Sequence, residues 1–284
     1  MTDLPARSSV LVTPDELEAA LASPAPPLVL DVRWRLDRPD GRPAFLEGHV
    51  PGAVYVDLDH ELAQHGAPEE GRHPLPSVDR LQEAARRWGL RQGQPVVVYD
   101  DLKNLSAARA WWLLRYAGVA DVRLLDGSLR AWTASGRPLE TGPVEPPAGD
   151  VELQYGALPV LDIDGAAALP EHGVLLDARA PERFRGEVEP IDPRAGHIPG
   201  ARSAPATANV DESGRFLPAD ELRARFESLG VTASAPVGVY CGSGVTAAAD
   251  AVALTLAGFA PQVFPGSWSQ WSSTPGRPVA VGED

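Results

Sequence analysis

The sequence predicts an α/β protein of two tandem domains, each a small parallel sheet flanked by helices. Three observations support this prediction. The chain repeats itself once, each repeat alternates short β-branched runs with helical patterns, and a segment rich in Pro and Gly separates the repeats. A chain of 284 residues is long enough for two ordinary domains of roughly 100–150 residues each.

Four motifs occur twice in the chain, in the same order, and define the repeat. Four ordered matches are difficult to attribute to chance. The third motif ends at Asp100 in the first repeat and at Cys241 in the second. The pairs are LVLDVRW and VLLDARA (28–34, 174–180), GHVPGA and GHIPGA (48–53, 196–201), PVVVYD and PVGVYC (95–100, 236–241), and DGSLRAW and PGSWSQW (126–132, 265–271).

Each repeat contains short apolar runs rich in β-branched residues, which are typical of strands buried on both faces of a parallel sheet. Thr13 is expected to cap a first helix, because Pro14 follows at N1 and Glu16 at N3. Ser106–Tyr116 and Val245–Leu256 carry small and apolar residues in helical patterns. The expected strands are Leu28–Val32, Val96–Tyr99, Val122–Leu125, Val174–Asp177 and Val237–Tyr240.

The boundary between the domains is expected near a segment without periodicity. Residues 138–159 are rich in Pro and Gly, and a segment this long is expected to pack along both domains. We therefore place an N-terminal domain at 1–140, a linker at 141–158 and a C-terminal domain at 159–284.

Composition narrows the class of protein. The formal net charge of −14 argues against a nucleic-acid partner, because binding phosphates requires a basic surface. No apolar stretch approaches the roughly 20 residues that a membrane helix needs, and no signal peptide is recognisable at the N-terminus. The single cysteine excludes an intramolecular disulfide and a multi-cysteine zinc site. These features predict a cytoplasmic protein without a membrane partner.

Cys241 occupies a position that favours nucleophilic chemistry. It ends an expected strand, and the glycine-rich loop that follows leads into an expected helix. Gly242 and Gly244 permit unusual backbone angles, so several N–H groups can point inward, and the helix adds the positive end of its dipole. A cysteine in such a cradle is expected to be largely thiolate. The alternative, a small buried apolar residue, is less consistent with a strand-to-helix turn.

Taken together, these motifs resemble those of the rhodanese superfamily, that is, of thiosulfate and 3-mercaptopyruvate sulfurtransferases. The resemblance covers nearly the whole chain and rests on GHVPGA and GHIPGA, DVRW and DAR, CGSGVTA and GSWSQW. Two tandem rhodanese domains with the cysteine only in the second are typical of this family. The resemblance implies that Asp100 marks an inactive first domain, which completes the active site at the interface, and that Cys241 carries sulfur as a persulfide.

The resemblance also suggests the sulfur donor. Members that prefer thiosulfate usually carry basic residues directly after the cysteine, whereas Gly242 and Ser243 are neutral. The loop is thus closer to the 3-mercaptopyruvate type, and we expect four of its residues to contact substrate: Gly242, Gly244, Val245 and Thr246.

Arginine side chains are expected to bind the donor's carboxylate. Arg183 matches the arginine that the family directs at this group. The family's second arginine lies nine residues later, where this chain has Asp192, so Arg194 is our candidate for that role, with Arg185 as the alternative.

The resemblance further implies a proton relay of Ser243, His49 and Asp40. An alternative remains open for His49, because His197 occupies the same place in the other repeat and GHxPGA could be a structural turn. No role is assigned to four other histidines, and no metal or organic cofactor is expected; these histidines are His60, His65, His73 and His172.

The predicted reaction is a two-step transfer from 3-mercaptopyruvate through the Cys241 persulfide to thioredoxin, glutathione or cyanide, with release of pyruvate. Two alternatives stay open: thiosulfate:cyanide sulfurtransferase, and a non-catalytic persulfide carrier or docking module. A phosphatase of the cell-division-cycle type is disfavoured, because its seven-residue cysteine loop closes on an arginine and residues 242–250 contain none.

Overall fold

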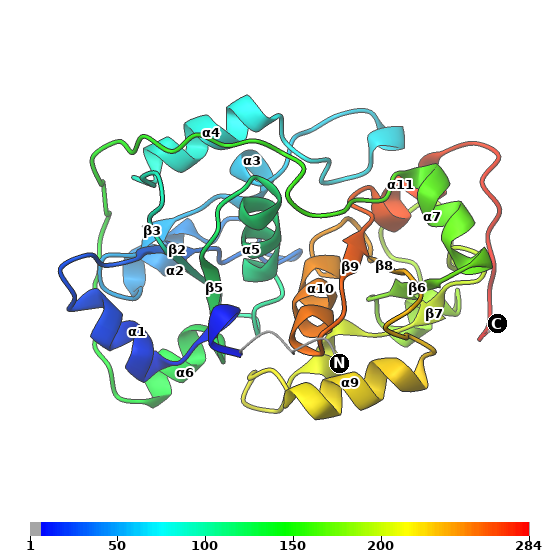
Figure 1. The fold of residues 1–284 in the computed structure, drawn as a ribbon. Coiled ribbons are helices and arrows are strands. Elements are labelled where there is room, and N and C mark those ends of the chain that lie inside the picture. Colours follow the sequence, from blue (N-terminus) through cyan, green and yellow to red (C-terminus); the bar gives the residue numbers. More distant parts are fainter. Residues whose placement is uncertain (1–6, 284) are drawn as a thin grey trace.

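The computed structural model describes residues 7–283 and contains two parallel sheets, one in each half of the chain (Figure 1). The first sheet has the strand order β1-β5-β4-β2-β3, and the second has the order β7-β6-β8-β9. The predicted fold class is confirmed. The strands are β1 (Leu11–Val12), β2 (Leu28–Asp31), β3 (Val54–Tyr55), β4 (Val96–Tyr99), β5 (Val122–Leu125), β6 (Val174–Asp177), β7 (Arg202–Ser203), β8 (Val237–Tyr240) and β9 (Pro261–Val263).

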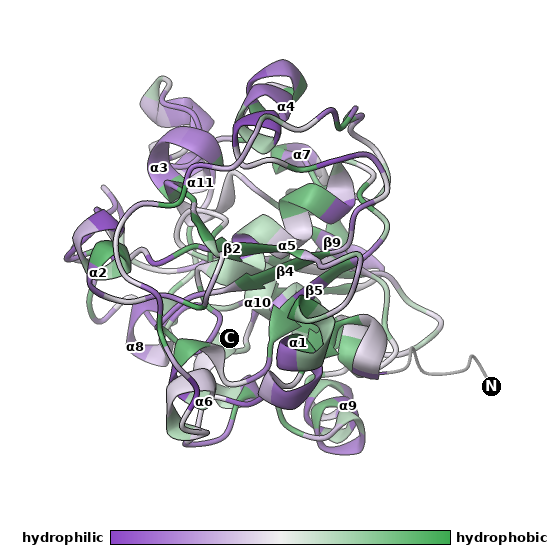
Figure 2. Cartoon of the chain, turned by 90° about the vertical axis from the view of Figure 1, so that its left-hand side faces the viewer, coloured by the Kyte–Doolittle hydropathy of each residue, from purple (hydrophilic) through white to green (hydrophobic). Residues whose placement is uncertain are grey.

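The strand pairings are parallel in both sheets. Leu28 of β2 lies opposite Val96 of β4, and Val174 of β6 lies opposite Val237 of β8. Every residue of β2, β4, β6 and β8 is buried, which explains why these segments are continuous apolar runs. Figure 2 shows the strands as hydrophobic ribbons at the centre, with more hydrophilic helices outside them.

Helices cover the faces of both sheets. Thr13 caps the first helix as predicted: the Glu16 amide donates to Thr13 Oγ1 at 3.3 Å, and the Thr13 amide donates to a Glu16 carboxylate oxygen at 2.8 Å. The helices are α1 (Pro14–Leu21), α2 (Arg42–Glu47), α3 (Leu58–Glu61), α4 (Val78–Arg87), α5 (Ala107–Tyr116), α6 (Ser128–Ala134), α7 (Ile163–Ala168), α8 (Pro181–Phe184), α9 (Ala219–Ser228), α10 (Ala247–Leu256) and α11 (Ser267–Ser273), with short 3-10 turns η1 (Arg7–Ser9), η2 (Pro68–Glu70), η3 (Leu169–Glu171) and η4 (Ala206–Asn209).

Two helices begin later than predicted. Helix α5 starts at Ala107 rather than Ser106, and α10 starts at Ala247 rather than Val245. The loop before α10 passes through a left-handed residue, Gly244 with φ of 79°, so the chain enters the helix only after the loop has closed around Cys241.

The segment between α6 and α7 packs along both halves, as the sequence predicted. Its Gln154 amide donates to the Ala117 carbonyl of the first half at 3.1 Å, and the Leu161 amide donates to the Val263 carbonyl of the second half at 2.9 Å. Figure 1 shows the segment running past α4 towards α7. The domain limits at 1–140 and 159–284, which include residues outside the described range, remain our proposal.

The two halves contact each other through α5 and α10, which lie side by side in Figure 1, and to a similar extent through η2 and α11. At a further contact, Arg7 of η1 donates to the carbonyls of Phe216 and Leu217 of the second half at 2.7 and 3.0 Å.

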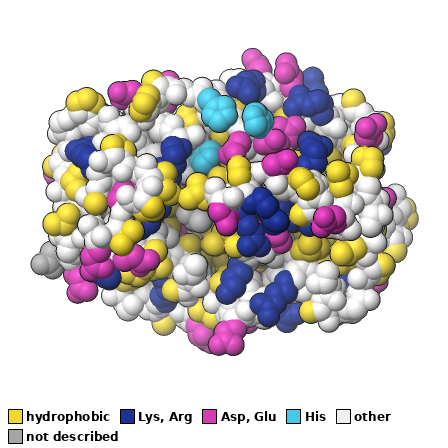
Figure 3. Space-filling view, turned by 180° about the vertical axis from the view of Figure 1, so that it is seen from behind, with side chains coloured by type: hydrophobic (Ala, Val, Ile, Leu, Met, Phe, Trp, Pro, Cys, Tyr) yellow, Lys and Arg dark blue, Asp and Glu magenta, His cyan; other side chains and the backbone are white. Residues whose placement is uncertain are grey.

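Charged side chains of both signs are mixed on the molecular surface. Figure 3 shows a cluster of Lys and Arg side chains near the centre of one face, with Asp and Glu side chains beside it and histidines nearby. Across residues 7–283, no helix combines the length and the apolar character needed to cross a membrane.

Candidate active site

Cys241 lies at the carboxyl end of β8, in a cavity of about 290 Å³ between the two halves. Its side chain is almost completely buried, with 1% of the residue exposed. The Gly244 amide donates to Cys241 Sγ at 3.1 Å. Within residues 7–283, the amides of Ser243, Val245 and Thr246 have no hydrogen-bond acceptor, so the loop keeps donors free for an anion. Gly242, Val245 and Thr246 line the cavity, whereas the contribution of Gly244 is the amide that donates to the sulfur.

The corresponding loop in the first half shows what such a cradle holds. There, one carboxylate oxygen of Asp100 accepts hydrogen bonds from the Leu102 and Asn104 amides, both at 2.8 Å. The other oxygen accepts from the Ser106 and Ala107 amides at 2.8 and 3.0 Å. The side chain of Asp100 therefore accepts the hydrogen bonds of its own loop, and these four amides are not available to a second anion.

A serine, a histidine and an aspartate form a chain of hydrogen bonds next to Cys241. His73 Nδ1 lies 2.7 Å from Ser243 Oγ, and His73 Nε2 lies 3.0 Å from Asp59 Oδ1. Because an ionised carboxylate only accepts, Nε2 carries the proton of the neutral imidazole and Ser243 donates its hydroxyl proton to Nδ1. The chain is thus polarised from the serine towards the aspartate.

The protonation states of this chain follow from burial and hydrogen bonding. Burial lowers the pKa of His73, against the opposing effect of Asp59, so the imidazole is neutral at pH 7. Burial tends to raise the pKa of Asp59, but hydrogen bonds, led by that from His73, outweigh this effect and hold the pKa below its usual value. Asp59 is therefore ionised and orients the histidine.

The relay predicted from the sequence, Ser243 with His49 and Asp40, is not assembled. His49 is fully buried, stacks on Phe45 at 3.9 Å between ring centroids, and its Nδ1 lies 2.8 Å from the Phe45 carbonyl. His197 makes the same contact with the Phe184 carbonyl, also at 2.8 Å, so GHxPGA is a structural turn. Asp40 is exposed and accepts from the Arg42 amide at 3.0 Å.

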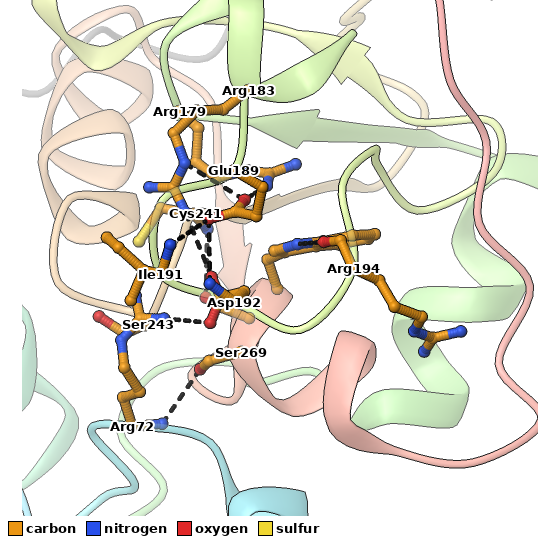
Figure 4. A network of polar contacts seen from close by, with 12 residues as sticks. Arg72, Arg179, Arg183, Glu189, Ile191, Asp192, Arg194, Cys241, Ser243 and Ser269 are labelled. Atoms are coloured by element: carbon orange, nitrogen blue, oxygen red, sulfur yellow. Dashed lines mark hydrogen bonds and ion pairs between the residues drawn. The ribbon is translucent and has the colours of Figure 1, made fainter. Parts of the chain in front are cut away.

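Of the predicted arginines, Arg183 reaches the cavity and Arg194 does not. Arg183 lines the same cavity as Cys241 and pairs with Glu189 at 2.7 Å. Arg194 donates instead to the carbonyls of Trp271 and Ser272, both at 2.7 Å, near the end of α11, where a cation satisfies unpaired carbonyl groups. Figure 4 shows the Arg194 side chain directed away from the network around Arg183. The alternative, Arg185, pairs with the exposed Glu187 at 2.7 Å.

Comparison with known proteins gives the family. The model of the rhodanese-like domain matches residues 13–135 and 163–274. The chain belongs to the rhodanese family. A Mycobacterium tuberculosis protein named as a thiosulfate sulfurtransferase, SseB, is 49% identical over 280 residues, covering 98% of this chain and 99% of that protein. A Pseudomonas aeruginosa protein named as a 3-mercaptopyruvate sulfurtransferase is 47% identical over 288 residues, covering 97% and 99%.

A solved structure supports the same assignment of fold. The crystal structure of SseA from Escherichia coli, described as showing the rhodanese fold and catalytic mechanism of 3-mercaptopyruvate sulfotransferases, aligns with a TM-score of 0.82 and 35% identity. The alignment covers 92% of this chain and 99% of that chain. Both rhodanese domains of this protein therefore have a structural counterpart, and the predicted resemblance is confirmed.

Three residues at the site of the second rhodanese domain come from the first and were missed by the sequence analysis: Asp59, Arg72 and His73. They lie between β3 and α4, outside the four repeated motifs. The signal that was available is a difference inside a shared segment: EEGRHPLP (69–76) resembles ESGRFLP (212–218) of the second repeat, but only the first contains a histidine. A histidine that one repeat alone carries is more informative about function than one that both repeats share, such as the histidine of GHxPGA.

Proposed function

We propose that this protein is a sulfurtransferase that takes sulfur from 3-mercaptopyruvate onto Cys241 as a persulfide and passes it to an acceptor, releasing pyruvate. The observation that supports this most strongly is the convergence of three groups in one cavity between the domains. These are a buried cysteine with free loop amides, an arginine, and a serine that donates to a histidine. The names of the relatives from P. aeruginosa and E. coli agree with this donor.

The donor is held by its two ends. Arg183 supplies charge-assisted hydrogen bonds to the carboxylate, while the donor sulfur faces Cys241 Sγ. The loop amides around Ser243, Val245 and Thr246 receive the negative charge that collects on the transferred sulfur.

The first step forms a sulfur–sulfur bond and breaks a carbon–sulfur bond. The Cys241 thiolate attacks the donor sulfur, and the electron pair of the broken bond goes to the methylene carbon, leaving the enolate of pyruvate. The donor's thiol proton passes through Ser243 Oγ to His73 Nδ1 and returns to the enolate, which yields pyruvate and the ionised persulfide. Asp59 stabilises the transient imidazolium through Nε2.

In the second step, an acceptor thiolate attacks the outer sulfur of the persulfide and regenerates the Cys241 thiolate. In a reducing cytoplasm this acceptor is a thiol such as thioredoxin or glutathione, and cyanide serves as a small acceptor that yields thiocyanate.

A second candidate function is thiosulfate:cyanide sulfurtransferase. It is favoured by the name of the M. tuberculosis relative and by a second guanidinium, that of Arg72, next to the cavity. A larger kcat/KM for thiosulfate than for 3-mercaptopyruvate would select this candidate.

The test is intact-protein mass spectrometry after addition of 3-mercaptopyruvate. We expect a gain of about 32 Da, one sulfur atom, which cyanide removes. The control is Cys241→Ser, which folds around a side chain of similar size and is expected to show no gain. No mass gain with 3-mercaptopyruvate or thiosulfate would contradict a sulfurtransferase, and a gain only from a protein partner would identify a carrier.

A further inference from the structure

Two arginines from different domains lie over Gly242, the residue that follows Cys241. A β-carbon placed on Gly242 would lie 3.1 Å from Arg72 Nη2 and 3.4 Å from Arg183 Nη1. Arg72 follows η2 in the first domain, and Arg183 belongs to α8 in the second. The cysteine loop carries no basic side chain, so these two guanidinium groups bring the positive charge to it.

Asp192 connects the two arginines. One carboxylate oxygen pairs with Arg72 Nη1, and the other lies 3.2 Å from Arg183 Nη2. The side chain of Asp192 is 3% exposed, and its amide donates to Glu189 at 3.1 Å, which fixes the loop. Figure 4 shows Asp192 between the two guanidinium groups. Asp192 therefore occupies the position that a substrate carboxylate needs.

The charges of this cluster are balanced. Three arginines, Arg72, Arg179 and Arg183, face three carboxylates, Asp177, Glu189 and Asp192.

Within this cluster, Arg72 is the cation most available to a ligand. Its side chain is 27% exposed, against 17% for Arg183 and 1% for Arg179. Within residues 7–283 its carboxylate partner is Asp192 alone, whereas Arg183 also pairs with Glu189. An incoming anion therefore has to displace the Asp192 carboxylate before it can pair with Arg72.

Arg72 also lies at the junction of two cavities. It lines the cavity of Cys241 and an outer cavity of about 510 Å³ that is also lined by Asp59, His73 and Asp192. A donor that enters from the outer cavity meets the Arg72–Asp192 pair before it reaches the cysteine.

We propose that Arg72 is the second donor-binding arginine and that Asp192 is a built-in counter-ion that makes the site favour monoanionic over dianionic sulfur donors. This inference rests on the proposed sulfurtransferase function. Its physical basis is that removing one negative charge from the site strengthens the attraction of a ligand in proportion to the ligand's own charge. A dianion such as thiosulfate gains twice the free energy that a monoanion such as 3-mercaptopyruvate gains.

The experiment compares KM and kcat/KM for both donors at low ionic strength in wild type, Asp192→Asn and Arg72→Gln. We expect Asp192→Asn to lower KM about threefold for 3-mercaptopyruvate and about tenfold for thiosulfate, since the second factor is the square of the first. Arg72→Gln should raise KM for both donors, and the KM for thiosulfate should again change more strongly. The matched control is Glu187→Gln, which removes one exposed carboxylate from the same loop and should leave the ratio of the two KM values unchanged.

A binding measurement separates this inference from the proposed function. In the Cys241→Ser background, where no sulfur transfer is possible, calorimetry measures the affinities for pyruvate and sulfate. Asp192→Asn should tighten sulfate binding more than pyruvate binding, and this result would stand even if wild type took no sulfur from either donor. Equal changes for both anions, or an Arg72→Gln protein with unchanged affinities, would overturn the inference. If Asp192→Asn does not fold, Arg72→Gln decides the question alone.

Discussion

At the scale of single residues, the site depends on a histidine whose hydrogen bonds define its state. His73 is buried between an aspartate that can only accept and a serine that can donate, so its proton is on Nε2 and its Nδ1 is a base. His49 is equally buried, but its Nδ1 contacts a backbone carbonyl and its ring stacks on Phe45, so it has no partner in the reaction. The difference between the two histidines lies in the groups that contact each ring.

The pH dependence of the reaction follows from His73. The proposed relay requires a neutral imidazole, and burial holds the His73 pKa below its ordinary value of 6.5. The activity that depends on His73 is therefore fully present at pH 7 and is lost as pH falls through the lowered pKa. We expect His73→Asn to lower kcat by about 10²–10⁴-fold and to remove this part of the acid limb from the profile of kcat against pH.

The control is His60→Asn, because His60 is exposed and, within residues 7–283, Asp57 is its one ion-pair partner. Its pH profile should match that of wild type. An His73→Asn enzyme with wild-type kcat would show that the relay does not operate.

At the scale of elements, the strand–loop–helix unit around Cys241 is the functional part of the second domain. Strand β8 buries the chain up to Tyr240, the loop turns around the sulfur, and α10 begins only at Ala247. The equivalent unit of the first domain closes its loop on the carboxylate of Asp100. In the first domain the loop amides thus bind an internal anion, the Asp100 carboxylate. In the second domain the equivalent loop leaves amide donors free for an external anion.

The loop tolerates only glycine at position 244. Its φ is +79°, and a β-carbon there would lie 2.3 Å from the Pro265 carbonyl oxygen. We expect Gly244→Ala to lower the free energy of unfolding by about 2–4 kcal/mol and kcat/KM by at least about tenfold, because the amide that contacts Cys241 Sγ must shift.

Gly276 provides the matched control for this change. It has nearly the same φ, +80°, but a β-carbon there would have no atom within 4 Å. Gly276→Ala should therefore cost only the left-handed backbone strain, about 1–2 kcal/mol, and leave kcat/KM unchanged. Urea unfolding and steady-state kinetics on both variants give the comparison, and equal activities would contradict the role of the loop.

At the scale of the whole molecule, the first domain acts through residues that cross the interface. Arg109 of α5 is fully buried, and its guanidinium donates to the carbonyls of Leu62, His73 and Gly244 at 3.1, 3.0 and 3.2 Å. It therefore joins the backbone of the relay histidine to the backbone of the cysteine loop. Burial lowers the pKa of Arg109 to about 10, so it remains charged at pH 7. Asp250, nine residues after Cys241, occupies the equivalent position in α10.

Replacing Arg109 tests whether the first domain is required for alignment of the site. Arg109→Met leaves three buried carbonyls without their donor, and we expect Tm to fall by about 4–8 °C. We also expect kcat to fall by at least about tenfold at 25 °C, where the variant is still folded, because His73 and Gly244 are no longer held together.

The comparison variant is Arg130→Met. Arg130 is exposed and donates across the interface to the Glu212 carbonyl at 3.2 Å, so its loss should change Tm and kcat little. Scanning calorimetry and steady-state kinetics measure both effects. Full kcat in Arg109→Met would show that this arginine does not align the site.

Local patterns in the sequence were sufficient for the fold and for the position of Cys241, the proposed nucleophile. The strands at Val96–Tyr99 and Val237–Tyr240 are buried on both faces, so their hydrophobic runs are visible without knowledge of their partners. The repeat then placed Cys241 opposite Asp100 at the carboxyl ends of equivalent strands. Both predictions depend on neighbours in the chain, and these are present in the sequence itself.

The partners of Cys241 were decided only by the tertiary structure. Ser243 and His73 are 170 residues apart in the sequence, and Arg72 and Asp192 are 120 residues apart. Such pairs are brought together when one domain packs on the other, and their segments carry no periodic pattern that predicts the contact. By itself, therefore, the sequence determined two rhodanese-like domains and the place of the proposed nucleophile, Cys241, whereas the packing of the domains determined which histidine and which arginines lie near it.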